Sequence, residues 1–97
     1  MTTPVPQKKK ETDYGALASP FMRIPRMPVA VARDLLDLGL RDIYELQGRA
    51  PEVLFQELKK KKPKTPDTHL AFLRLAVYFA ENPQPERGKL HPDAWRD

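Results

Sequence analysis

Few residues of this chain have the types and spacing that catalysis needs. The two histidines, His69 and His91, lie far apart, and the 97 residues include no cysteine, so we expect no cluster of metal ligands. The only serine, Ser19, has no base beside it, and no glycine-rich loop is present that would cradle a phosphate. Asp34 and Asp37 have the spacing of ordinary solvated helix residues. We therefore predict that the protein is not an enzyme and needs no metal or cofactor.

Positively charged side chains point instead to binding. Arginines surround a proline-containing turn at residues 24–28, and five lysines fall within residues 59–64. The net charge of +4 is a mild basic bias that permits nucleic-acid binding without requiring it. Guanidinium groups hold phosphates through paired hydrogen bonds, whereas lysines at a helix end also stabilise the helix itself, so the lysine run has two interpretations. The predicted nucleic-acid-binding residues are Arg23, Arg26, Arg33, Arg49, Lys59, Lys60, Lys61, Lys62 and Lys64.

These side chains belong to a predicted set of short helices joined by tight turns. An amphipathic helix that begins at Pro28 should end at Gly39, because glycine readily adopts the left-handed conformation of a helix stop. An apolar helix that ends near Ala80 or Glu81 should lie at the centre of the core. Further helices are expected at residues 20–23, behind the Asp42–Glu45 capping box, and from Pro51 into the lysine run.

The chain is long enough for one domain with a modest core. We expect residues 1–13 to be a disordered tail, because the segment is rich in proline and lysine and has little to bury. The domain should span residues 14–81 as an all-α, compact bundle of about five short helices. Residues 82–97 show no helical period and should form an irregular tail, docked through the lone Trp95.

Two stretches carry a resemblance to known proteins. Ile24-Pro25-Arg26-Met27-Pro28, followed by Ala32-Arg33-Asp34-Leu35, resembles the helix-hairpin-helix pattern, in which a hydrophobe-Pro-Gly-hydrophobe-Gly turn precedes a helix. LLDLGLRDIYELQGRAPEVLFQEL and LRLAVYFA resemble the small bacterial pathogenicity-locus family, often labelled mitomycin-resistance or helix-hairpin-helix proteins. The resemblance implies a SAM-like fold of two hairpin units, around Arg26 and Gly48, and a context of DNA damage.

The sequence departs from the hairpin pattern at the positions that bind phosphate. Arg26 stands in the place of the first glycine, Pro28 in that of the second, and Ala30 in that of a polar residue. Proline has no amide hydrogen to donate, so the phosphate-binding signal of this hairpin is largely erased. Arg23, Arg26 and Arg33 would compensate in part, and the second hairpin keeps Gly48 and Arg49.

Two functions remain from different classes. The favoured one is nonspecific binding of the backbone of double-stranded DNA by a small cytoplasmic module, which we expect to be a monomer. The alternative is a protein-interaction module that has lost DNA binding and docks an unidentified protein on an exposed apolar tip at Met27, Pro28 and Val29. No apolar run is long enough to span a membrane, so neither function involves one.

Overall fold

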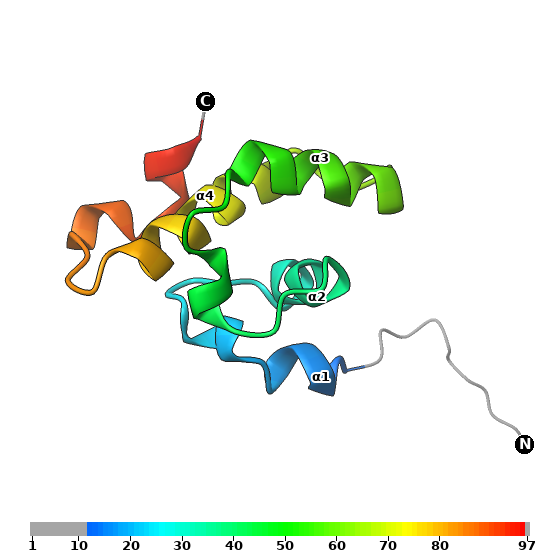
Figure 1. The fold of residues 1–97 in the computed structure, drawn as a ribbon, viewed down its shortest axis with the longest axis horizontal. Helices are drawn as coiled ribbons and strands as arrows, with labels where there is room; N and C mark the ends of the chain where they lie inside the picture. Colours follow the sequence, from blue (N-terminus) through cyan, green and yellow to red (C-terminus); the bar gives the residue numbers. More distant parts are fainter. Residues whose placement is uncertain (1–11, 97) are drawn as a thin grey trace, which may run out of the picture.

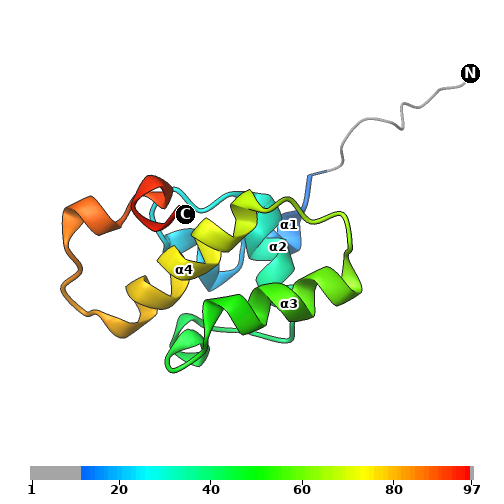
Figure 2. The same ribbon diagram turned by 90° about the horizontal axis from the view of Figure 1, so that it is seen from above.

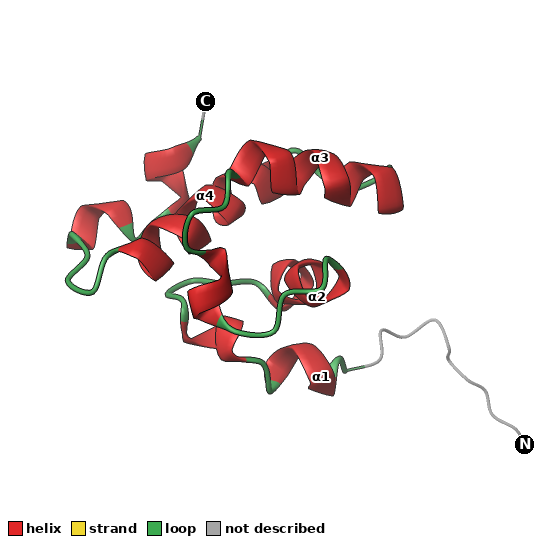
Figure 3. Cartoon of the chain, in the orientation of Figure 1, coloured by secondary structure: helices red, strands yellow, loops and turns green. Residues whose placement is uncertain are grey.

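The computed structural model describes residues 12–96, and over that range the chain is all-α (Figures 1 and 3). The expected compact helical bundle is confirmed, and residues 12–96 contain no strand. The predicted disorder of residues 1–11 lies outside the described residues. The α-helices are α1 (Tyr14–Leu17), α2 (Val29–Asp37), α3 (Pro51–Lys61) and α4 (Thr68–Glu81). The 3-10 helices are η1 (Pro20–Arg23), η2 (Ile43–Leu46), η3 (Arg87–Lys89) and η4 (Pro92–Trp95).

Local sequence signals explain where these helices begin and end. The capping box before η2 is formed, with the Asp42 and Glu45 side chains both accepting backbone hydrogen bonds. α2 ends in a Schellman motif: Gly39 has φ 91°, its N–H donates to Leu36, and the Leu40 N–H donates to Leu35. Pro28, expected as the first helical residue, is instead the N-cap residue of α2.

α4 is the centre of the core, as its composition predicts. Leu73, Leu75 and Ala76 are fully buried, and the helix packs against α3, η2, η4 and α2 (Figure 2). Ala71 lies on the face of α4 that looks polar in the sequence, yet it is buried. It lines a hollow together with Trp95, so the C-terminal segment covers this face of the helix.

The C-terminal segment, expected to be irregular, contains the two short helices η3 and η4. A single 3-10 turn needs no amphipathic period, and Pro92 supplies the fixed φ that starts η4. The Trp95 ring packs on Tyr78 at 5.3 Å between centroids, and its indole N–H donates to the Lys89 carbonyl at 2.9 Å. Arg74 of α4 donates to the Trp95 carbonyl, so both the ring and the backbone of the segment are held.

The core extends from α4 to the space between α1, α2 and η1. α1 packs against α2 and η1, and Ala16, Phe21 and Ile24 fill the space between them. None of the helices within residues 12–96 is long and apolar enough to cross a membrane.

We expect Leu73→Ala to lower the free energy of unfolding by about 2–5 kcal/mol, because the side chain is fully buried in α4 and its loss leaves a cavity. Val53→Ala on α3 is the control: Val53 is 47% exposed, so the change should stay within about 0.5 kcal/mol. Urea denaturation of both variants measures this, and equal losses would contradict a core centred on α4.

Candidate functional site

Two tight turns, at residues 24–27 and 46–49, have the same backbone geometry. In the first, the Met27 N–H donates to Ile24 and Arg26 has φ 62°. In the second, the Arg49 N–H donates to Leu46 and Gly48 has φ 77°. Both have the hydrogen bond and the positive φ at the third residue of a type II turn, and each begins five residues before the next helix. The chain therefore contains one structural unit twice.

The turns differ in what surrounds their exposed backbone. The Gly48 N–H donates to the Glu81 carboxylate at 2.7 Å, and the Gln47 side chain donates to the Ala80 carbonyl at 2.9 Å. The second turn is thus closed by the end of α4. Figure 2 also places it at the opposite edge of the molecule from the first turn and the loop between α3 and α4. Arg49, carried by the second turn, is separated from the other predicted cations, and it lies 3.9 Å from Glu57.

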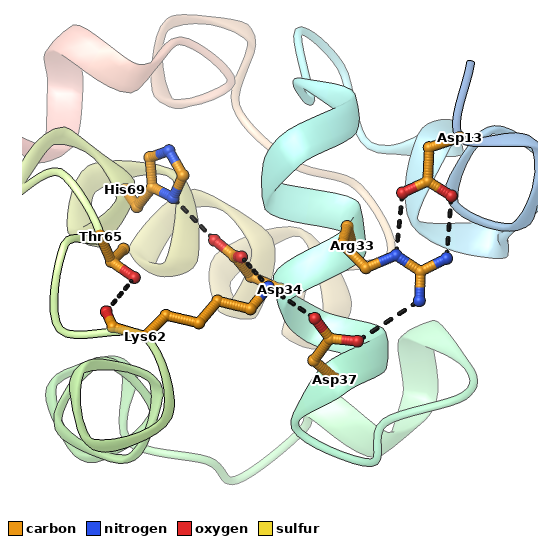
Figure 4. Close-up of polar contacts among 7 residues, drawn as sticks. All are labelled: Asp13, Arg33, Asp34, Asp37, Lys62, Thr65 and His69. Carbon is orange, nitrogen blue, oxygen red and sulfur yellow. Dashed lines mark hydrogen bonds and ion pairs between the residues drawn. The ribbon is translucent and has the colours of Figure 1, made fainter. Parts of the chain in front are cut away.

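Arg33, predicted to contact nucleic acid, is held by two carboxylates (Figure 4). Its Nε and Nη2 donate to the two oxygens of Asp13, each at 2.8 Å, and its Nη1 donates to Asp37 at 3.3 Å. The hydrogen bond from Arg33 lowers the pKa of Asp13 from 3.8 to about 2, assisted by the Ala16 N–H, which also donates to this carboxylate. Asp13, expected in the disordered tail, instead caps α1 and ties it to α2.

Lys62 is likewise engaged inside the protein. Its ammonium contacts Asp34 at 3.0 Å and also pairs with Asp37. Partial burial opposes the charge, but the hydrogen bonds to Asp37 and Asp34 outweigh it and raise the pKa of Lys62. Partial burial likewise acts against the ionised form of Asp37, yet Lys62 and Arg33 together lower the pKa of this carboxyl.

Asp34 is buried, contrary to the prediction that it is an ordinary solvated helix residue. It is 4% exposed rather than solvated, and its Oδ2 lies 2.7 Å from Nδ1 of His69 at the start of α4. Figure 4 shows the carboxylate between His69 and Lys62. Helical spacing could have indicated this burial, because Asp34 follows the buried Val31 by three residues and therefore lies on the same face of the helix.

The charged groups of this cluster are paired with one another. The Thr65 hydroxyl, drawn beside the cluster in Figure 4, donates to the Lys62 carbonyl at 2.7 Å. Within the described part of the chain, no group of three metal-ligating side chains is positioned to hold an ion. The Asp34 cluster is therefore best described as a structural connection between α2, the end of α3 and α4.

Most of the remaining predicted cations are exposed, and Lys59 is the exception. Lys59 donates to the Thr65 carbonyl at 3.1 Å and lies over the Phe55 ring. Lys60, Lys61 and Lys64 are exposed and make no ion pair with any described residue. Arg23 precedes the first turn and Arg26 lies within it. Both are also exposed and make no ion pair with any described residue. The apolar tip expected for protein interaction is less exposed than predicted. Met27 is 6% exposed and belongs to the core, whereas Pro28 and Val29 are partly buried.

Comparison with known proteins gives one match. The family model described as Cdd1, pathogenicity locus, matches residues 16–94. No curated protein and no solved structure is significantly similar to the chain.

Asp34→Ala should lower the free energy of unfolding by about 3 kcal/mol, because it leaves the His69 Nδ1 and the partly buried Lys62 without their shared partner. Asp37→Ala removes a more exposed carboxylate and should cost about 1 kcal/mol or less. Chemical denaturation compares the two. A smaller loss for Asp34→Ala than for Asp37→Ala would contradict the structural importance of the buried carboxylate.

The Asp13–Arg33 pair predicts a specific acid sensitivity. Because folding lowers the pKa of Asp13 from 3.8 to about 2, the pair contributes stability above pH 3.8, and this contribution is lost as the pH falls through about 2. Asp13→Asn should therefore be less stable than wild type at neutral pH, and the difference should shrink towards pH 2. Urea titrations across this range measure it, with Asp67→Asn, an exposed carboxylate, as the control. A difference that does not change with pH would contradict the prediction.

Proposed function

We propose, for a chain that belongs to the Cdd1 pathogenicity-locus family, that this protein is a small non-enzymatic helix-hairpin-helix module that binds the backbone of double-stranded DNA without sequence specificity. Its contact surface is the basic edge, which we define as the first hairpin turn with Arg23 and Arg26 and the end of α3 with Lys60, Lys61 and Lys64. The mitomycin-resistance label given to similar proteins would place this binding in the repair of, or protection from, DNA damage.

The observation that carries the proposal is the conformation of Arg26. A non-glycine residue at φ 62° is unfavourable by about 1 kcal/mol or more, and such strain concentrates at functional positions. The turn that hairpin proteins build with glycine is thus kept here with arginine. Its backbone can approach a phosphate in the same way while its side chain adds a charge.

The start of α2 supports the same conclusion. No side chain caps this helix end, and the N–H groups of Val29 and Ala30 have no acceptor within the helix because they belong to its first turn. Pro28 removes one donor, as the sequence indicates, but two remain beside the turn. These amides and the positive end of the helix dipole favour an anion at this place.

The lysines of residues 59–64 divide into two that contact groups inside the protein and three that we assign to the basic edge. Lys62 and Lys59 turn inward to Asp34 and Thr65 and stabilise the loop between α3 and α4. Lys60, Lys61 and Lys64 keep their charges available. In Figure 2 the loop between α3 and α4 lies on the same side of the molecule as the first hairpin turn. In Figure 1 this turn and the C-terminal end of α3 lie far apart along the horizontal axis, so a duplex would have to run along the length of the domain to contact both.

Protein interaction remains the second candidate, and the closure of the second turn by Glu81 favours it. A carboxylate on the Gly48 N–H occupies a donor that a DNA-binding hairpin would offer to phosphate. The burial of Met27 removes the centre of the apolar tip on which that function was expected to depend. The features of the first turn therefore favour the DNA-binding function, and those of the second turn favour protein interaction.

An amide NMR titration with a short DNA duplex tests the proposal. We expect shifts at the first turn and residues 59–64 that fade as salt is raised, because each phosphate contact releases counterions. The combined variant Arg26→Gly, Lys60→Ala, Lys61→Ala and Lys64→Ala should weaken binding about tenfold or more at low salt. Glycine at position 26 removes the charge and keeps the turn.

Arg49→Ala on the opposite edge is the matched control and should bind as wild type does. Equal binding by the combined variant and the wild type would exclude the basic edge. A spectrum unmoved at low salt would exclude the DNA proposal altogether and leave protein interaction as the function to pursue.

A further inference from the structure

We propose that the C-terminal segment and the first hairpin turn together form a binding site for a terminal phosphate group, with Arg26 and Arg87 as its two charged ligands. The ligand would be the phosphorylated end of a nucleic acid, and in that respect the inference rests on the proposed function and deepens it. The sequence alone does not indicate that Arg26 and Arg87 lie close together, because they come from opposite ends of the domain.

The site is a hollow of about 450 Å³ between these segments. It is lined by Pro25, Arg26, Arg87, Gly88, Leu90 and His91. A side chain at Gly88 would meet no atom within 4 Å, so this side of the hollow opens to solvent and gives a ligand access. Docking of Trp95 on Tyr78 and of its indole N–H on Lys89 holds the segment that carries Arg87 and His91 against the bundle.

The hollow presents positive charge that no internal carboxylate neutralises directly. Arg26 and Arg87 form no ion pair with any described residue. Asp93 is the acid close enough for Arg26 to influence, but its carboxylate already accepts a hydrogen bond from Arg96 at 2.7 Å. The two guanidinium groups are therefore left to bind an anion from outside.

His91 adds an imidazole donor. Its Nδ1 lies 3.1 Å from the Asp93 N–H and 3.5 Å from the Asp93 Oδ2, and Nε2 carries a proton whenever Nδ1 is the acceptor. An Nε2–H group on the wall of the hollow can donate to a phosphate oxygen. The site thus combines two planar guanidinium forks with one imidazole donor, a set that suits the several oxygens of a phosphate.

These ligands match an end phosphate better than an internal one. A phosphomonoester has three free oxygens and a charge close to −2 at neutral pH, because its second pKa is about 6. An internal phosphodiester carries one charge, and the nucleosides on both sides of it oppose entry into a hollow. The comparable hollow beside Lys62 and His69 is a poorer candidate, because Asp34 lines it and already pairs with both groups.

Fluorescence anisotropy with two duplexes of one sequence, whose ends carry either phosphate or hydroxyl groups, tests the inference on the full chain. We expect the phosphorylated duplex to bind about tenfold more tightly, since two charge-assisted contacts are gained. Arg87→Ala should abolish that preference while leaving the hydroxyl-ended duplex bound. Lys89→Ala, which removes a neighbouring positive charge that lies near Glu86 outside the hollow, is the control and should keep the preference.

The outcomes separate this inference from the proposed function. Equal binding of the two duplexes would overturn the terminal-phosphate site and leave backbone binding intact. If neither duplex binds, the proposed function fails, and a titration with inorganic phosphate followed by amide NMR decides the site alone. Shifts at Arg26, Arg87 and His91 would then support a site for a free phosphate compound, and unmoved signals would overturn the site as well.

Discussion

A single buried carboxylate determines how the helices of this protein meet. Asp34 projects from α2 into the space between the end of α3 and the start of α4, and it contacts Lys62 and His69 there. A buried charge is costly unless it is paired and hydrogen-bonded, so both partners stabilise the packing of α2 in this position. Lys62, which follows the last residue of α3, and His69, in the first turn of α4, are thereby held beside α2. The apolar contacts of the core are less specific, because hydrophobic side chains tolerate several packings.

The same network limits what the net charge can reveal about binding. Arg33 and Lys62 count fully in a sequence-based charge, yet each is held by two carboxylates within the fold. Releasing either to a phosphate would cost its internal pairs, so neither is suited to an external ligand. The cations at the first turn and Lys60, Lys61 and Lys64 make no ion pair with any described residue. The number of basic residues in the sequence therefore overstates how many positive charges are open to an external ligand.

Local features of the fold were predictable from sequence, and features that depend on tertiary contact were not. The Gly39 stop, the capping box at Asp42 and the boundary of α4 follow from interactions within a few residues. The burial of Asp34 and Met27 depends on partners far along the chain, and no local pattern reports them. Asp13 was assigned to a tail because its neighbours are polar, although its bidentate pair with Arg33 makes it part of the domain. In the candidate site, the arginines of the first turn could be identified from the sequence. The position of Arg87 could not, because it depends on the docking of Trp95.

The two tight turns have the same backbone conformation but different surroundings. Gly48 adopts its positive φ at little cost, and the carboxylate of Glu81 satisfies its amide, so this turn serves the packing of α3 on α4. Arg26 adopts the same conformation at a cost, and no described carboxylate pairs with its side chain. A residue chosen only for stability at that position would be glycine or asparagine. Arginine at this position is unfavourable for the backbone, and its charge acts on Asp93, whose carboxylate already accepts a hydrogen bond from Arg96. The strained turn is therefore the more informative of the two, because its residue type is not one that its backbone conformation favours.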